Sequence, residues 1–305
     1  MPSGTAMMIL DEAAVRRLLD MEELIPAMER ALADLSSGRV VQPVRTMVPV
    51  AEHGGFLGVM PAYAGALGVK LVTLYPENRG LPTHHAVIQL FRPETGEPLV
   101  MMDGRLITEE RTAAVSAVAT RLLARPEAAV LALIGSGAQA RSHLKALRLV
   151  RRFREIRVWS PRHAPDFARE FASLGVRATD SAAAAVRGAD VIVTATTSRT
   201  PVLHGAWLSP GAHVNAVGAP RPDWRELDDA LLQQARLYVD SREAALQESG
   251  DVRAGGTIVA ELGEVAAGTR PGRQTAGEIT LFKSLGQAVE DVVTADLIYK
   301  KALAK

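Results

Sequence analysis

The stretch LALIGSGAQA, residues 131–140, decides the fold. It reads as an apolar strand, a glycine turn of the form G-x-G-x-x-A, and the start of a helix. Gly135 permits the tight turn, and Gly137 lets the backbone approach a pyrophosphate closely. The helix starts at Ala138 and Gln139, and its first N–H groups face the same phosphates. The order of strand, turn and helix therefore predicts a dinucleotide-binding site.

The sequence after this stretch alternates apolar strands with helices. Strands are expected at residues 155–160, 176–179, 189–196, 213–218 and 236–241, and helices at residues 138–150, 165–175, 181–188 and 226–234. Strands that are apolar throughout are typical of a parallel sheet covered by helices on both faces. The predicted fold class is therefore α/β, with a doubly wound parallel sheet of the Rossmann type.

The sequence before the stretch is rich in short strands. Runs of β-type residues at 44–50, 56–60, 68–75, 85–91 and 97–103 are separated by glycine and proline turns. A helix over residues 11–35 is expected to break at Pro26, and Thr108 is expected to cap a helix that ends before Pro126. We predict two domains: a β-rich domain of residues 1–112, to which the last helix (285–305) returns, and a Rossmann domain of residues 113–284.

Composition excludes several classes of protein. The 305 residues include 35 Lys and Arg against 34 Asp and Glu, so the net charge of +1 provides no global field for binding nucleic acid. Cysteine is absent, which excludes disulfides and thiolate chemistry. Because no run approaches the ~20 apolar residues of a membrane helix and no signal peptide is visible, we expect a cytoplasmic protein that binds neither membrane nor nucleic acid.

The second strand of the predicted Rossmann domain indicates which cofactor is bound. Enzymes that use NAD usually place a carboxylate at the end of this strand, where it holds the ribose 2′-hydroxyl. Here the strand ends at Ser160, and Arg162 and His163 follow. Arginine can bind a 2′-phosphate, which a carboxylate would repel. We therefore predict NADPH rather than NADH; the alternative is that Arg162 is an ordinary surface residue.

Further cofactor contacts are expected where other strands end. Ligands of open α/β sheets bind at the carboxyl ends of the strands. The residues at these ends are Thr194, Ala195, Thr196, Val217 and Gly218. Gly218 in addition allows the backbone to come close to a ligand.

Three cations in or beside the β-rich domain could bind an anion. Lys70 lies within an apolar strand, where a charge is unfavourable unless it is paired. Arg45 lies in the strand over residues 44–50, and Arg111 in the first turn of the helix that follows Thr108, where the helix dipole favours anions. Together the three could hold a substrate carboxylate; the alternative for each is a structural salt bridge. The His84-His85 pair lacks the spacing of a metal site, and no metal is predicted.

Several longer motifs, spread over almost the whole chain, carry a family resemblance. They include QPVRT (42–46), LGVMPAY (57–63), KLVT (70–73), RTAAVSA (111–117), GAHVNAVG (211–218), EAALQESGDV (243–252) and FKSLG (282–286). On these motifs the chain resembles the ornithine cyclodeaminase/mu-crystallin family. The resemblance implies a Rossmann domain joined to a β-rich domain that binds the substrate and forms a homodimer.

The resemblance also implies which residues form the site. The catalytic candidates, which would hold a substrate carboxylate beneath the nicotinamide, are Arg45, Lys70 and Arg111. The other residues of the substrate site would be Met60, Thr83, Glu248 and Ser284. Additional contacts with the cofactor would come from Thr83, His84, Arg111, Ser284, Leu285 and Gly286.

Two departures from the family pattern indicate the reaction. Cyclodeaminases and the related alanine dehydrogenases carry an aspartate where this chain has Pro220, and cyclodeaminases carry a glutamate where it has Gly58. The mu-crystallin branch lacks both acids. The resemblance therefore favours reduction of a C=N bond next to a carboxylate, with piperideine-2-carboxylate and pyrroline-2-carboxylate, two small imino acids, giving pipecolate and proline. The alternatives are an ornithine cyclodeaminase or alanine-dehydrogenase-like enzyme, a reductase of acyclic imines, and an NADPH-dependent thyroid-hormone-binding protein.

Overall fold

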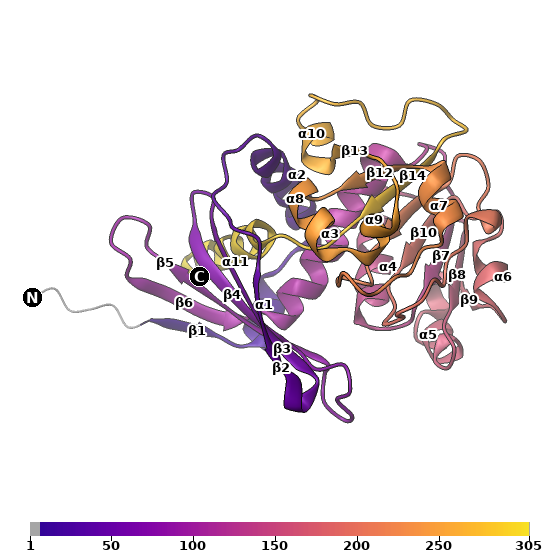
Figure 1. Ribbon diagram of the computed structural model, residues 1–305. Coiled ribbons are helices and arrows are strands. Elements are labelled where there is room, and N and C mark those ends of the chain that lie inside the picture. The colour runs from indigo at the N-terminus through magenta and orange to yellow at the C-terminus, as the bar shows by residue number, and fades with distance from the viewer. Residues whose placement is uncertain (1–6, 305) are drawn as a thin grey trace, which may run out of the picture. The chain divides into compact units, whose positions relative to one another are not determined.

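The structure is a computed structural model that describes residues 7–304. These residues divide into two compact units. The first unit contains residues up to Arg111 together with those from Gln287 onward, and the second runs from Thr112 to Gly286. Figure 1 follows the chain through the helices and strands of both.

An all-parallel sheet of eight strands forms the second unit. The strands are β7 (Val130–Ile134), β8 (Glu155–Trp159), β9 (Val176–Ala178), β10 (Val191–Thr194), β11 (His213–Ala216), β12 (Ala235–Val239), β13 (Ile258–Glu261) and β14 (Ile279–Lys283). Their order is β13-β12-β14-β11-β10-β7-β8-β9, and every pairing is parallel. The strand order reverses between β7 and β10, which is the point where doubly wound sheets bind ligands. The predicted fold class is confirmed.

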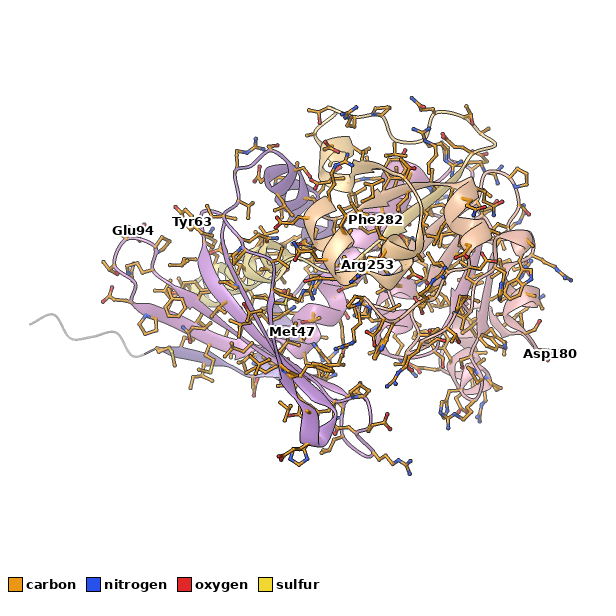
Figure 2. All side chains as sticks on the ribbon, in the orientation of Figure 1. Met47, Tyr63, Glu94, Asp180, Arg253 and Phe282 are labelled. Atoms are coloured by element: carbon orange, nitrogen blue, oxygen red, sulfur yellow. The ribbon has the colours of Figure 1, made fainter. Side chains whose placement is uncertain are left out.

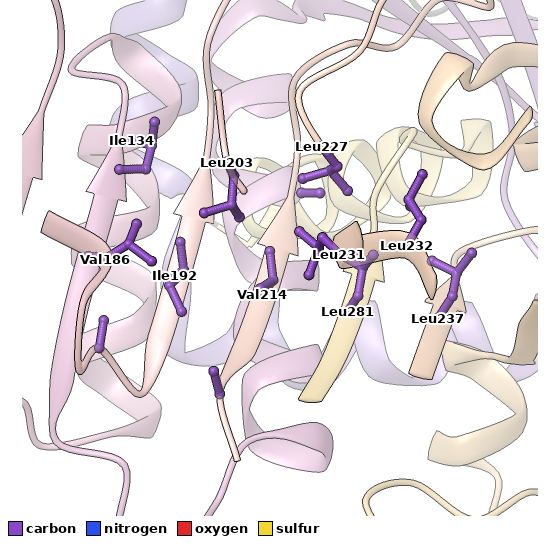
Figure 3. Packing of buried hydrophobic residues seen from close by; sticks show 14 of the residues in the cluster. Ile134, Val186, Ile192, Leu203, Val214, Leu227, Leu231, Leu232, Leu237 and Leu281 are labelled. Carbon is purple, nitrogen blue, oxygen red and sulfur yellow. The ribbon is translucent and has the colours of Figure 1, made fainter. Parts of the chain in front are cut away.

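Helices cover both faces of this sheet, and all five residues of β7 are therefore buried. The helices are α4 (Ala138–Val150), α5 (Ala164–Glu170), α6 (Ala182–Val186), α7 (Asp229–Gln234), α8 (Arg242–Glu248), α9 (Gly250–Ala254), α10 (Leu262–Ala266) and most of α3 (Arg105–Leu123). Figure 3 shows the core on one face, where Ile134, Ile192 and Val214 of neighbouring strands pack with Val186 and Leu231 of the helices. None of the helices between residues 7 and 304 combines the length and the apolar character that a membrane span requires.

A mixed sheet of six strands forms the first unit. The strands are β1 (Met8–Leu10), β2 (Thr46–Val50), β3 (Gly55–Tyr63), β4 (Leu67–Leu74), β5 (His84–Phe91) and β6 (Pro98–Asp103), in the order β1-β6-β5-β4-β3-β2. The pairing of β1 with β6 is parallel, and the other pairings are antiparallel. The predicted series of short strands is confirmed for β2 to β6, whereas β1 was not predicted.

The two faces of the six-stranded sheet differ. On one face, α11 (Ala288–Leu303) packs against β3, β4 and β5 and against α2 (Met21–Ser36), and α1 (Glu12–Leu18) packs against β6. The other face leaves large apolar side chains exposed in this chain. They are Ile9, Val48, Tyr63, Leu71, Val87 and Met101, of which Tyr63 is labelled in Figure 2.

The predicted break at Pro26 is wrong. The helical region breaks instead at Leu19 and Asp20, between α1 and α2. The Asp20 side chain caps α2 by accepting the N–H of Glu22 at 2.9 Å, and Pro26 lies inside α2. The N-cap at Asp20, six residues before Pro26, thus sets the boundary, because it satisfies a free N–H that would otherwise be unpaired.

The predicted cap at Thr108 is also wrong. The helix starts three residues earlier, at Arg105, and the Asp103 carboxylate accepts the N–H groups of Arg105 at 3.1 Å and of Leu106 at 3.2 Å. Arg111 therefore lies in the second turn of α3, where the field of the helix N-terminus is weaker than we expected.

Candidate functional site

The glycine turn of the second unit has the geometry that a dinucleotide requires. Gly135 has a φ of 116°, and a Cβ at this position would lie 2.3 Å from the carbonyl oxygen of Ala195. A Cβ at Gly137 would meet nothing within 4 Å, so the space in front of this residue is open. Gly137 is the N-cap of α4 and supplies no side-chain acceptor, so the first N–H groups of α4 are available to a phosphate.

The end of β8 presents polar groups and no carboxylate at the position of the ribose. The hydroxyls of Ser136 and Ser160 lie 2.8 Å apart and connect the glycine turn to the end of β8. Ser160 Oγ also accepts the N–H of His163 at 3.1 Å. Arg162 is exposed and forms no ion pair with any described residue, whereas the imidazole of His163 lies 3.5 Å from the carboxylate of Asp166.

The predicted contact residues at the other strand ends lie together at the carboxyl edge of the sheet. Thr194 ends β10, and Ala195 and Thr196 follow it; Val217 and Gly218 follow β11, and Ser284, Leu285 and Gly286 follow β14. The N–H groups of Leu285 and Gly286 are held by Asp240 Oδ2, at 2.6 and 2.8 Å. The hydroxyls of Thr194 and Ser284 are buried without a hydrogen-bond partner in the described chain. Such orphaned groups are typical of positions that a ligand completes.

The first unit contains a buried charged cluster. Lys70 of β4 lies opposite Met60 of β3 in the register of the sheet, and both side chains are on the face that α11 covers. Lys70 Nζ lies 2.5 Å from Asp291 Oδ2. Arg111 lies 2.9 Å from Asp291 Oδ1 and 2.6 Å from Glu290 Oε2. These four charged side chains are at most 4% exposed.

The cluster changes the ionisation of its members. Burial lowers the pKa of Lys70 to about 8; the charges of Arg111 and Arg45 add to this shift, and Asp291 opposes it. Burial alone would raise the pKa of Asp291, but the charges of Arg111 and Lys70 outweigh burial and lower it. Lys70 is therefore mostly protonated at pH 7, and Asp291 is ionised.

His84, the first residue of β5, faces the same cluster. Burial, together with the charges of Lys70 and Arg111, lowers the pKa of His84 to about 4. The imidazole is therefore neutral at pH 7, and its buried Nε2 has no hydrogen-bond partner within residues 7–304. Its neighbour His85 points to the exposed face, as the alternation of a strand requires. No set of three His, Asp or Glu side chains in the described chain could hold a metal ion.

The structure thus brings Lys70, Arg111 and His84 together in the first unit, with Met60 beside Lys70 and Arg45 close enough to affect its pKa. Arg45 precedes β2 by one residue and does not lie within the strand, contrary to our prediction. Thr83 directly precedes β5. Glu248, the last residue of α8, belongs to the second unit and is half-buried.

Sequence reasoning missed Glu290 and Asp291. Both lie in α11, where a pair of acids (VEDVV, residues 289–293) interrupts an otherwise apolar run. The signal was therefore present, because acids on the buried side of an apolar helix require cationic partners. Only the fold, however, shows that those partners are Arg111, 180 residues before Asp291 in the chain, and Lys70, which lies earlier still.

Comparisons with known proteins agree with this geometry. The model of the ornithine cyclodeaminase/mu-crystallin family matches residues 5–305. The chain is 54% identical over 288 residues to the ketimine reductase mu-crystallin of Mus musculus, covering 90% of this chain and 91% of that protein.

Two solved structures are similar over nearly the whole chain. One is Δ1-pyrroline-2-carboxylate reductase of Thermococcus litoralis in complex with NADH and L-proline, with a TM-score of 0.94, 42% identity and coverage of 98% of each chain. The other is an archaeal alanine dehydrogenase dimer with bound NAD, with a TM-score of 0.92, 36% identity and coverage of 98% of this chain and 96% of that one. From the match of the family model and these identities, the chain belongs to the ornithine cyclodeaminase/mu-crystallin family.

Proposed function

We propose that this protein is an NADPH-dependent reductase of C=N bonds next to a carboxylate, with cyclic ketimines such as pyrroline-2-carboxylate and piperideine-2-carboxylate as substrates. The observation that carries the proposal is the buried cluster of the first unit. Lys70 and Arg111 lie there beside the carboxylates of Glu290 and Asp291, and Arg45 is close enough to affect the pKa of Lys70. These cations would attract a carboxylate, and the relative from Thermococcus litoralis holds an imino acid, L-proline.

Each cation has a role in holding the substrate. The planar guanidinium of Arg111 can bind a carboxylate through two parallel hydrogen bonds, even while it remains oriented by α11. Asp291 keeps the Lys70 ammonium charged at neutral pH, although burial favours its neutral form. Fixing the carboxylate fixes the imine carbon beside it, and this orientation is the main contribution of the protein to the reaction.

No carboxylate is proposed to handle a substrate amine. The position that holds glutamate in cyclodeaminases is Gly58 here, and a Cβ at this residue would lie 2.9 Å from Val72 Cγ1 and 3.1 Å from Met47 Sδ. The strand therefore has little room for an acidic side chain at this position. A protonated imine is already electrophilic, so its reduction does not require a strong general acid.

The second unit fits a nicotinamide dinucleotide. The open space at Gly137 and the uncapped N-terminus of α4 would hold the pyrophosphate, and Ser160 and Arg162 would hold the 2′-phosphate. When bound, the reduced nicotinamide supplies the hydride that is added to the imine carbon. NADPH is proposed over NADH because Arg162 is exposed without an ion-pair partner among the described residues and no acid follows β8 directly.

We also propose that the first unit forms a homodimer through the outer face of its six-stranded sheet. In the register of the sheet, Ile9 lies opposite Met101, and Leu71 lies opposite Val87. These side chains are between 36% and 72% exposed in a single chain, which is unusual for large apolar residues gathered on one face of a sheet. A second copy of the same face would cover them, and the archaeal alanine dehydrogenase of similar structure is a dimer.

The test is an NADPH oxidation assay with the two cyclic ketimines, followed by identification of proline and pipecolate as products. Rates with NADPH and NADH are compared at equal, low concentrations, for the wild type and for Arg162→Ala. We expect turnover of at least one ketimine and a preference for NADPH that Arg162→Ala reduces about tenfold, the loss of one charge-assisted contact. Faster rates with NADH in the wild type would contradict the cofactor assignment.

Two control reactions separate the alternatives. Ornithine with catalytic NAD⁺ would yield proline only if the protein were a cyclodeaminase, and pyruvate with ammonia and NADH would be consumed only by an alanine dehydrogenase. Tight binding of an iodothyronine without ketimine turnover would instead indicate a binding protein. Each of these outcomes would overturn the proposed reaction.

A further inference from the structure

A second buried charged cluster lies in the second unit, at the carboxyl ends of β10, β11 and β14. It consists of Glu226, Asp251 and Lys283, and all three side chains are fully buried. Lys283 Nζ lies 3.0 Å from Asp251 Oδ2 and donates a hydrogen bond to the carbonyl oxygen of Gly218. Asp251 Oδ1 accepts the N–H groups of Glu226 and Leu227, both at 3.0 Å. None of the three side chains has a role in the chemistry described so far.

Glu226 contacts two of the loops that would surround the cofactor. Its Oε1 accepts the N–H of Thr196 at 2.7 Å and the hydroxyl of Thr196 at 2.5 Å. A Cβ at Gly218 would lie 2.3 Å from Glu226 Cδ and 2.4 Å from each of its oxygens. The carboxylate thus lies directly behind Gly218, and this contact explains why the position holds glycine.

The cluster contains one more acidic group than basic groups. The carboxyl groups of Glu226 and Asp251 accompany the single ammonium of Lys283. In both hydrogen bonds between Glu226 and Thr196, Thr196 is the donor and the Glu226 oxygen accepts. The other oxygen, Oε2, has no hydrogen-bond partner within the described chain. Burial raises the pKa of Glu226, and the charge of Lys283 and the hydrogen bonds of Thr196 oppose this rise without cancelling it, so the effect of its charge is tested at a pH above neutral.

The position of the cluster relates it to the nicotinamide half of the cofactor. In doubly wound sheets the first three strands serve the adenosine half, and the second set of strands serves the other nucleotide. In the present sheet the second set begins with β10, β11 and β14, where the cluster lies. Hydride donation turns a neutral nicotinamide into a cation, so a fixed negative charge near this place would favour the oxidised form.

We propose that Glu226 is a positioning residue that holds the loops at Thr196 and Gly218 and, through its charge, stabilises the oxidised nicotinamide relative to the reduced one. This inference rests on the proposed function, because it requires that a nicotinamide cofactor binds to the second unit. It adds that the buried charge increases the tendency of the bound cofactor to give up its hydride.

The experiment measures binding and not turnover. Dissociation constants for NADP⁺ and NADPH are determined by calorimetry at pH 8 for the wild type, Glu226→Gln and Glu226→Asp. We expect Glu226→Gln to weaken the binding of NADP⁺ about tenfold more than the binding of NADPH. This difference corresponds to about 1.4 kcal/mol. Glu226→Asp keeps the charge, so the ratio of the two constants should stay within about twofold of the wild type even if both affinities fall.

Three further variants make the result specific. Thr196→Val removes the hydroxyl from the same loop without changing charge. It should weaken the binding of NADP⁺ and of NADPH by the same factor. Glu155→Gln removes a charge at the amino end of β8 and should leave the ratio unchanged. Asp251→Asn keeps an acceptor for the backbone but neutralises the cluster, so it should lower the preference for NADP⁺ at least threefold even if Glu226→Gln does not fold.

The outcomes distinguish this inference from the proposed function. Equal weakening of both forms by Glu226→Gln would show a purely structural residue and overturn the inference, as would an unchanged ratio in Asp251→Asn. A wild type that binds neither NADP⁺ nor NADPH would overturn the proposed function, and this inference with it. A selective loss of NADP⁺ affinity would support the inference even if ketimines were not the substrates.

Discussion

Replacing Asp291 with asparagine tests the buried cluster of the first unit. Asp291 lies 2.5 Å from Lys70 Nζ and 2.9 Å from the Arg111 guanidinium, and none of the three side chains is accessible to solvent beyond 4%. Removing one partner of a buried ion pair typically costs about 3–5 kcal/mol, because the charge that remains is uncompensated. We expect Asp291→Asn to lower the free energy of unfolding at pH 6 by about 3 kcal/mol, the lower end of this range, since Arg111 keeps Glu290 as a partner.

The loss should depend on pH in a defined direction. Burial lowers the pKa of Lys70 from 10.5 in the unfolded chain to about 8 in the folded protein. Between these values the unfolded chain binds more protons than the folded one, so the free energy of unfolding of the wild type rises with pH only above about pH 8. In Asp291→Asn the attraction that keeps Lys70 protonated is gone, so its pKa falls further and the same rise starts at lower pH. The difference between the two proteins should therefore shrink by about 1.4 kcal/mol per pH unit as pH increases toward 8.

The assay is urea unfolding followed by tryptophan fluorescence at pH 6, 7 and 8. Asp296→Asn is the matched control, because it removes a charge from an exposed ion pair with Lys300 on the same helix, and it should change stability by less than about 0.5 kcal/mol. The KM for the ketimine should rise in Asp291→Asn at pH 8 and partly recover at pH 6, where Lys70 regains its proton. A stability difference that stays constant from pH 6 to 8 would refute the argument that Asp291 holds this proton.

Three other predictions follow from the geometry. Arg45→Ala and Arg111→Ala should each raise the KM for the ketimine at least tenfold in steady-state assays; if both leave kcat/KM within about twofold, or ~0.4 kcal/mol, the carboxylate-binding role is wrong. Gly135→Ala should abolish cofactor binding in a fluorescence titration, because its Cβ would overlap a backbone oxygen at 2.3 Å and its φ of 116° strains any side chain. Val87→Glu should convert the proposed dimer to a monomer in size-exclusion chromatography with light scattering, since it places a charge in the centre of the exposed apolar face; an unchanged mass would argue for a different interface.

The local signals in the sequence predicted most of the fold. The helix at residues 138–150 was predicted with the bounds that the structure shows, and the strand before it to within two residues, because apolar periodicity and glycine conformation act over short distances. The errors at Pro26 and Thr108 arose where two candidate signals competed. In both cases an aspartate, Asp20 or Asp103, satisfied the free N–H groups of the helix and determined where it starts.

The candidate site was harder to predict because its members come from distant parts of the chain. The sequence indicated Lys70 and Arg111 as unusual cations, but it could not show that Asp291 lies between them. It also showed no reason to single out Glu226, which stands among other polar residues in the run RPDWRELDD (221–229). Only the packing of the sheet shows that this acid, unlike its neighbours Asp228 and Asp229, is fully buried.

The discontinuous first unit has a consequence for protein synthesis. Its sheet is complete once Arg111 has been made, but the carboxylates that neutralise Lys70 and Arg111 lie in α11, about 180 residues later. At 5–20 residues per second the nascent chain would wait roughly 10–40 s for them. During that time the second unit can fold independently, whereas the first cannot bury its cations without a large penalty. A chain released early, without its last helix, should therefore keep this sheet open and accessible to proteases, so that α11 distinguishes finished from unfinished chains.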